Sequence, residues 1–142
     1  MDVGRLREIP IFAAMSDADL RKIATFATED SAAAGTVLMR EGDYSTELIG
    51  IEEGTADVVK GSGRKLGTLG PGDVFGEMGV FTKEQRTASV IATSPVRLVK
   101  LSMWDVKRLG PETKARLRAL VDERRASDRL REAPSHAGTD PA

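Results

Sequence analysis

The sequence predicts a mostly β protein: an antiparallel β-roll of the jelly-roll type, with an N-terminal helix, a one-turn helix inside the roll and helices at the C-terminal end. Helical periodicity occurs before Thr28 and after Ser102, and short β-prone runs fill the region between them. Many short strands separated by glycine turns are typical of a roll or sandwich and not of alternating βα units. The turn signals are Ala34-Gly35, Glu41-Gly42-Asp43, Glu53-Gly54, Gly61-Ser62-Gly63, Gly70-Pro71-Gly72 and Ser94-Pro95.

The N-terminal segment has the pattern of one amphipathic helix. Ser16 is the predicted N-cap, and Asp19 follows three residues later, which is the spacing of a capping box. The apolar residues that come next at helical spacing are Leu20, Ile23, Ala24 and Ala27. The preceding run "LREIPIF" is predicted to form a short helical turn that Pro10 breaks, with Ile11 and Phe12 packed against the segment after them.

Six runs between the turns have strand composition: "TVLMR", "ELIGIE", "TADVVK", "RKLGTL", "RTASVIAT" and "VRLVKL". The pattern is interrupted once, by "GEMGVF" from Gly76 to Phe81, which is too short for an ordinary helix. A single helical turn at this place would present free backbone N–H groups inside the roll, and such groups suit an anion.

Helical periodicity returns after the last strand. The run "SMWDVKRL" predicts a short helix that ends at Gly110, and Pro111 is well placed to begin a longer helix, with Glu112 favourable in its first turn. The apolar stripe of that helix contains Leu117, Leu120 and Val121.

The domain organisation predicted from these patterns is one domain over residues 1–132 and a disordered tail over 133–142. Within the domain we expect N-terminal helices in 5–27, the β-roll in 28–102 and the C-terminal helices in 103–132. Whether the chain is a stand-alone module or a fragment of a longer protein stays open.

Composition excludes several classes of function. The 142 residues are 40% apolar and 30% charged, with a net charge of -1, which gives no overall field for nucleic acid or anionic membranes. The chain has no cysteine and a single histidine, His136, so a cysteine nucleophile, a disulfide and a His-cluster metal site are excluded. No apolar run is long enough for a membrane span, and the N-terminus has no secretory signal pattern, so we expect a cytoplasmic protein.

Glu77 and Arg86 are the candidate functional residues. They could form a simple salt bridge. Their setting favours ligand binding, because a carboxylate on a one-turn helix can accept hydrogen bonds from vicinal hydroxyls and a facing arginine can clamp a phosphate. A ligand with a ribose hydroxyl and one phosphate close together would satisfy both residues.

The stretch "FGEMGVFTKEQRTASV" resembles the phosphate-binding cassette of the cyclic nucleotide-binding domain family, which includes the catabolite activator protein, protein kinase regulatory subunits and cyclic-nucleotide-modulated channels. The resemblance extends from about Leu6 to about Leu130 and includes "IPIFAAMSDADLRKIA" and "GTVLMREGD". The match of Phe-Gly-Glu, of the arginine and of their spacing makes it specific.

The resemblance implies that Glu77 contacts the ribose 2′-hydroxyl, that Gly76 opens the cassette helix and that Arg86 binds the phosphate. Thr87 takes the position of a hydroxyl that favours guanine in channel and cyclic-GMP-kinase sites; as an alternative, it is simply a β-prone residue. The chain departs from the family pattern at Gly79 and Gln85, and neither departure removes a charged contact. The full set of implied ligand-binding residues is Gly76, Glu77, Met78, Gly79, Arg86, Thr87 and Ala88.

The family's last helix acts as a lid over the base. The candidates for this role here are Leu117, Leu120, Val121 and Arg124. An apolar stripe on a terminal helix more often packs on its own domain or pairs with a second subunit, so a homodimer through this helix is an alternative.

The resulting hypothesis is a non-catalytic receptor for cyclic AMP or cyclic GMP that needs no cofactor and signals to an unidentified protein effector. Ligand capture would order the cassette helix, move Met78 and Phe81 against the flanking helices and close the Pro111 helix. We expect no nucleic-acid partner, because the residues after the last helix are too few and too polar for a helix-turn-helix. The alternative is an interaction or dimerisation module on the same fold with a degenerate, ligand-free pocket.

Overall fold

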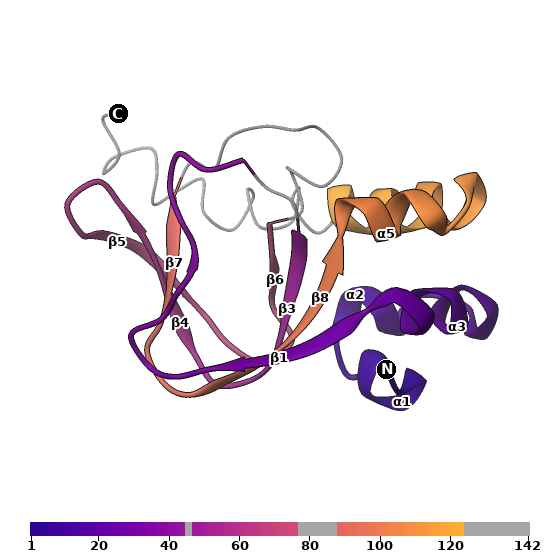
Figure 1. The fold of residues 1–142 in the computed structure, drawn as a ribbon, viewed down its shortest axis with the longest axis horizontal. Helices are drawn as coiled ribbons and strands as arrows, with labels where there is room; N and C mark the ends of the chain where they lie inside the picture. The colour runs from indigo at the N-terminus through magenta and orange to yellow at the C-terminus, as the bar shows by residue number, and fades with distance from the viewer. Residues whose placement is uncertain (45–46, 77–87, 124–142) are drawn as a thin grey trace.

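The computed structural model describes residues 1–44, 47–76 and 88–123. Within this part of the chain the strands form two four-stranded antiparallel sheets that face each other as a roll, with the helices gathered on one side (Figure 1). The predicted fold class is therefore confirmed. One sheet has the order β1-β8-β3-β6 and the other β2-β7-β4-β5. The strands are β1 (Thr28–Ala32), β2 (Val37–Met39), β3 (Glu47–Glu53), β4 (Ala56–Lys60), β5 (Arg64–Leu69), β6 (Val74–Phe75), β7 (Ser89–Ala92) and β8 (Val96–Ser102).

Five of the six predicted strand runs become β2, β3, β4, β5 and β8 over most of their lengths, and the sixth supplies β7. The first residues of that sixth run, 86–87, lie outside the described residues. The structure adds β1 and β6, which were not among the six predicted runs. The run "TEDSA" of β1 is polar and mostly exposed, and it is a strand because it pairs along β8 from Thr28↔Lys100 to Ala32↔Val96.

Two short helices precede the predicted amphipathic helix. They are α1 (Val3–Leu6) and α2 (Pro10–Ala13). The prediction that Pro10 breaks a helical turn is wrong in one respect, because Pro10 begins α2 as its first residue. A proline fits there, since its missing N–H has no partner within the helix and its φ is already helical. Ile11 and Phe12 are buried, as expected.

The amphipathic helix α3 (Asp17–Phe26) begins where the sequence indicated. The Ser16 hydroxyl accepts a hydrogen bond from the backbone N–H of Asp19 at 3.2 Å, which is one half of a capping box. The carboxylate of Asp19 instead contacts Thr113 and Arg116 of the helix over residues 111–123.

The C-terminal helices follow β8 directly. Helix α5 (Met103–Arg108) is capped by the Ser102 hydroxyl, which accepts from the N–H of Asp105 at 3.0 Å. The longer helix covers residues 111–123 as far as the structure describes it and has Pro111 as its first residue. Both helices were predicted.

Two clusters of buried side chains lie on opposite faces of the β1-β8-β3-β6 sheet. The roll core lies between the sheets and consists of Ile49, Ile51, Ala56, Phe75, Val90, Ala92, Val96 and Leu98. The helical cluster joins the helices to the outer face of β3 and β8 and includes Leu6, Ile9, Phe12, Leu20, Ile23, Leu48, Val99, Leu101, Val106, Leu109, Leu117 and Val121. Because strand side chains alternate between faces, Leu48 and Ile49, which are neighbours in sequence, belong to different clusters.

Candidate ligand-binding site

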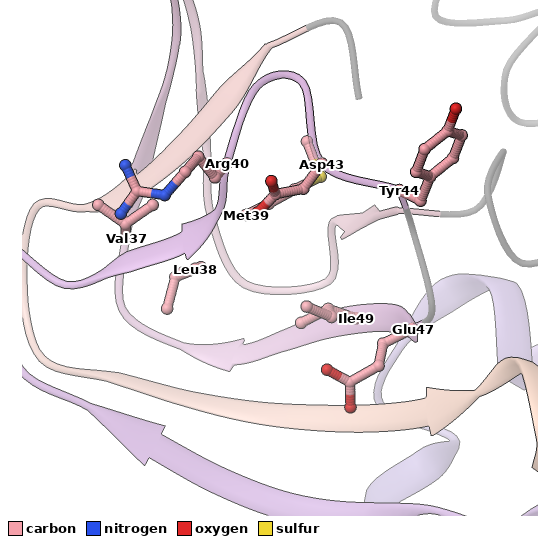
Figure 2. A pocket seen from close by; sticks show the side chains of 8 residues that line it. All are labelled: Val37, Leu38, Met39, Arg40, Asp43, Tyr44, Glu47 and Ile49. Atoms are coloured by element: carbon pink, nitrogen blue, oxygen red, sulfur yellow. The ribbon is translucent and has the colours of Figure 1, made fainter. Parts of the chain in front are cut away.

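A cavity of about 230 Å³ opens into the roll between β2 and β3. Figure 2 shows its lining, which comes from β2, from the loop after it and from the start of β3. The lining side chains are Val37, Leu38, Met39, Arg40, Asp43, Tyr44, Glu47 and Ile49. Ile49 belongs to the roll core, and Leu38 and Met39 pack against that core, so one part of the cavity wall is apolar.

The remaining lining is polar and charged. Arg40, Asp43 and Glu47 place one positive and two negative groups around the cavity. In Figure 2 the Arg40 guanidinium extends toward Val37, and the ring of Tyr44 points away from the other side chains. Tyr44 is 65% exposed, so its hydroxyl lies in solvent.

The loop that carries the polar residues is tied to β7. The Ser89 hydroxyl accepts a hydrogen bond from the N–H of Glu41 at 2.8 Å. The Glu41 carboxylate in turn accepts from the N–H of Gly61 at 2.9 Å, at the β4–β5 turn. These contacts hold the loop over residues 40–44 against the sheet that contains β2 and β7.

Each wall strand of the cavity pairs with one end of the predicted cassette segment. On β3, Ile49 pairs with Phe75, the residue before Gly76. On β2, Met39 pairs with Val90, two residues after Ala88. The described residues before and after 77–87 are therefore next to the two cavity walls, and the segment 77–87 itself lies outside the described residues.

The two predicted site residues at the ends of this segment are in the described part of the chain. Gly76 follows β6, is buried and has a φ of +83°, a conformation that strongly favours glycine. Ala88 precedes β7 and is 6% exposed. The other predicted ligand contacts, Glu77, Met78, Gly79, Arg86 and Thr87, fall within 77–87, as do Gln85 and Phe81.

The three predicted lid residues that the structure describes do not line the cavity in this conformation. Leu117 and Val121 are 0% and 1% exposed and belong to the helical cluster, on the far face of the β1-β8-β3-β6 sheet. Leu120 is partly buried against the same cluster. Arg124 lies outside the described residues.

The sequence analysis predicted the cassette over residues that lie outside the described part of the chain, and it assigned no ligand contact to the cavity lining that the structure describes. Asp43 was part of a turn signal and of the run "GTVLMREGD" that carries the family resemblance, and Glu47 and Ile49 were part of a strand run. A strict alternation along "ELIGIE" places Glu47 and Ile49 on one face, but the cavity also depends on β2, which belongs to the other sheet.

Among residues 1–44, 47–76 and 88–123 there is no group of three or more histidine or acidic side chains that could hold a metal ion. The described helices also include none with the length and apolar character needed to cross a membrane.

A β-roll with flanking helices and a cavity between its two sheets, at β2 and β3, defines the class of ligand-binding β-roll domains. The model of the family described as "Cyclic nucleotide-binding domain" matches residues 29–110 of the chain. This protein therefore belongs to the cyclic nucleotide-binding domain family.

Individual relatives agree with this assignment. The chain is 31% identical over 108 residues to the cAMP-dependent protein kinase regulatory subunit of Colletotrichum orbiculare, covering 75% of this chain and 28% of that protein. It is 33% identical over 114 residues to cGMP-dependent protein kinase, isozyme 1, of Drosophila melanogaster, covering 75% of this chain and 15% of the kinase. The chain thus spans less than a third of the length of these curated relatives.

A solved structure matches over nearly its full length. The N-terminal domain of a transcriptional regulator from Streptomyces coelicolor A3(2) superposes with a TM-score of 0.73 at 30% identity. The match covers 90% of this chain and 95% of that domain.

Proposed function

We propose that this protein binds cyclic AMP or cyclic GMP in the cavity of its β-roll and acts as a regulatory module. The observation that carries the proposal is the pairing of Ile49 with Phe75 and of Met39 with Val90. The described residues on both sides of the Gly-Glu…Arg segment thus pair with the two strands that form the cavity wall, which supports a single site that includes the segment's predicted ligand contacts and the described lining.

The chemistry of the segment fits a cyclic nucleotide. Arg86 supplies a guanidinium that can clamp the cyclic phosphate with two parallel hydrogen bonds, and Glu77 supplies an acceptor for the ribose 2′-hydroxyl. The apolar wall near Ile49 offers a surface for the ligand's rings. Each hydrogen bond to a charged group contributes about 1.5–3 kcal/mol. Loss of Arg86 should therefore raise the dissociation constant of the ligand by about a hundredfold or more.

The proposed output is a movement of the helix over residues 111–123. A lid role for Leu117 and Val121 requires that this helix leave the helical cluster, because the β1-β8-β3-β6 sheet separates both side chains from the cavity. A ligand that binds more tightly to the form with the helix closed over the base would shift the population toward that form. The effector that senses this change is then a separate protein or a further part of a longer chain.

The proposal is tested by calorimetric titration of the purified chain with cyclic AMP and cyclic GMP, alongside Arg86→Leu at the same salt. Arg97→Leu is the matched control, because Arg97 lies on β8 with a half-exposed side chain that pairs with Glu53. We expect saturable binding by the wild type and the control, and a loss of at least a hundredfold in Arg86→Leu. No binding by the wild type at millimolar ligand would refute the proposal and favour the interaction module with a ligand-free pocket, for which Gly79 and Gln85 are the sequence arguments.

The choice between the two nucleotides is assigned to Thr87. The variant Thr87→Val keeps the shape of the side chain and removes its hydroxyl. Loss of one neutral hydrogen bond to guanine should weaken cyclic GMP binding about two- to tenfold and leave cyclic AMP binding nearly unchanged. Equal changes in affinity for the two nucleotides would show that Thr87 is only a β-prone residue and does not select the base.

A further inference from the structure

A buried polar cluster outside the cavity joins α3 to the helix over residues 111–123. Asp19 and Thr113 are 2% and 0% exposed, and they are the buried polar side chains of the described residues. The Thr113 hydroxyl donates to Asp19 Oδ1 at 2.7 Å. Arg116 donates from Nη2 to Oδ1 at 2.8 Å and from Nε to Oδ2 at 2.6 Å.

The charge on Asp19 depends on these partners. An ionised carboxylate in an apolar surrounding is unfavourable unless it is paired and hydrogen-bonded. The Arg116 guanidinium holds the pKa of the Asp19 carboxyl well below its usual range, with smaller contributions from Thr113 and Lys22, although burial acts in the opposite direction. Asp19 therefore favours the arrangement in which the 111–123 helix lies against α3.

The partners Thr113 and Arg116 lie in the first two turns of the helix, and the proposed lid residues Leu117 and Val121 follow in the second and third turns. Leu117 and Val121 are buried in the helical cluster together with Leu48 and Val99 of the sheet. The cavity is on the other face of that sheet, where Ile49 lies. The contacts of Asp19 thus stabilise a position in which neither lid residue can cover a ligand.

The contact between the 111–123 helix and α3 is open to solvent on one side. Asp19 and Arg116 line a groove of about 550 Å³ together with Met15 and Leu120. The Arg116 side chain is 54% exposed, so water already reaches the ion pair from this side. Separation of the two helices would hydrate both charges from this side, and it would also take Leu117 and Val121 out of the helical cluster.

We infer that Asp19, Thr113 and Arg116 form a latch that holds the 111–123 helix away from the ligand cavity and thereby lowers the apparent affinity for the cyclic nucleotide. This inference rests on the proposed function. When the binding-competent form is a minor fraction of the population, the apparent dissociation constant rises in inverse proportion to that fraction. Weakening the latch should raise the fraction and tighten binding.

The test compares the full chain with Asp19→Asn and Thr113→Val, two substitutions of nearly unchanged shape that weaken the latch from either helix. Asp122→Asn is the matched control, because it removes a carboxylate from the same helix, where Asp122 faces Arg118 in an exposed pair. The readouts are the dissociation constants for cyclic AMP and cyclic GMP and the amide hydrogen exchange of residues 111–123 without ligand. The two latch variants keep the inference testable if one of them fails to fold.

We expect about tenfold tighter binding of the preferred nucleotide in a latch variant, the effect of one lost charge-assisted hydrogen bond, and faster exchange across the helix. The control should match the wild type in both readouts. Unchanged or weaker binding by latch variants, with a wild type that binds, would overturn the latch and leave the receptor intact. If neither the wild type nor any variant binds, the proposed function itself fails, and the regulatory role of the latch fails with it.

Discussion

Arg116 binds both carboxylate oxygens of Asp19, a residue 97 positions earlier in the chain. The two side chains differ sharply in their surroundings, because the Asp19 side chain is 3% exposed and that of Arg116 is 54% exposed. This asymmetry means that the two charges have unequal desolvation costs, and substitutions of the two residues should not be equivalent.

Replacing the arginine should destabilise the protein more than neutralising the aspartate. Arg116→Met leaves a buried carboxylate with the Thr113 hydroxyl as its remaining side-chain donor among the described residues, at a cost of about 2–4 kcal/mol. Asp19→Asn removes the buried charge and leaves a half-exposed guanidinium in water, at a cost of about 1 kcal/mol. Urea denaturation of the two variants and of the double variant measures the difference, and equal costs for the single variants would contradict the argument.

The pH dependence of the free energy of unfolding should show the contribution of the Asp19–Arg116 ion pair. Because the folded pKa of Asp19 is depressed, its contribution to stability is complete above the unfolded pKa of about 3.9 and is lost as the pH falls from there toward the folded value. The groups that act on Asp19 are Arg116, Thr113 and Lys22, and Glu112 also acts on Arg116.

The stability difference between the wild type and Arg116→Met should therefore shrink as the pH is lowered from about 5 to about 2. Lys100 also lowers the pKa of Asp30, but this contribution is common to both proteins and cancels in the comparison. Chemical denaturation at several pH values gives the difference directly. A difference that stays constant over this range would show that Asp19 has an ordinary pKa in the folded protein.

Gly54, in the β3–β4 turn, should be far less tolerant of substitution than Gly35. Both have positive φ, at +93° and +91°. A Cβ atom on Gly54 would lie 2.2 Å from the Pro95 carbonyl oxygen, whereas one on Gly35 would have nothing within 4 Å. We expect Gly35→Ala to lower the free energy of unfolding by about 1–2 kcal/mol, because of backbone strain. Gly54→Ala should lower it by about 3 kcal/mol or more, because the Cβ atom also clashes with the Pro95 carbonyl. Similar losses in the two variants would mean that the turn moves away from Pro95 without cost.

Leu117→Ala should test the packing of the 111–123 helix apart from any ligand. The Leu117 side chain is fully buried in the helical cluster, so its truncation leaves a cavity and should cost about 2–5 kcal/mol. Leu66→Ala is the control, because Leu66 on β5 is 41% exposed and should change stability by less than about 0.5 kcal/mol. A loss near zero for Leu117→Ala would indicate that the helix is mostly undocked in solution.

Local sequence determined those parts of the fold that depend on neighbouring residues. The capping hydroxyl of Ser16, the end of α5 near Gly110 and the start of the next helix at Pro111 all occur where the sequence indicated. The strands of high β propensity were likewise predicted, because their side-chain preferences act within each short run. The cassette motif identified the family for the same reason, since its residues are contiguous.

Tertiary structure decided the rest, because the deciding partners are distant in sequence. The mostly polar strand β1 forms through its pairing with β8, and no pattern within its five residues contains that information. The sequence placed Asp19 in a local capping box, whereas the fold gives its carboxylate to Thr113 and Arg116. The stripe with Leu117 and Val121 indicated burial, but a helical period specifies a buried face and not the surface that covers it. That surface lies on the far side of the β1-β8-β3-β6 sheet from the cavity. The helix must therefore move before its predicted lid residues could cover a ligand.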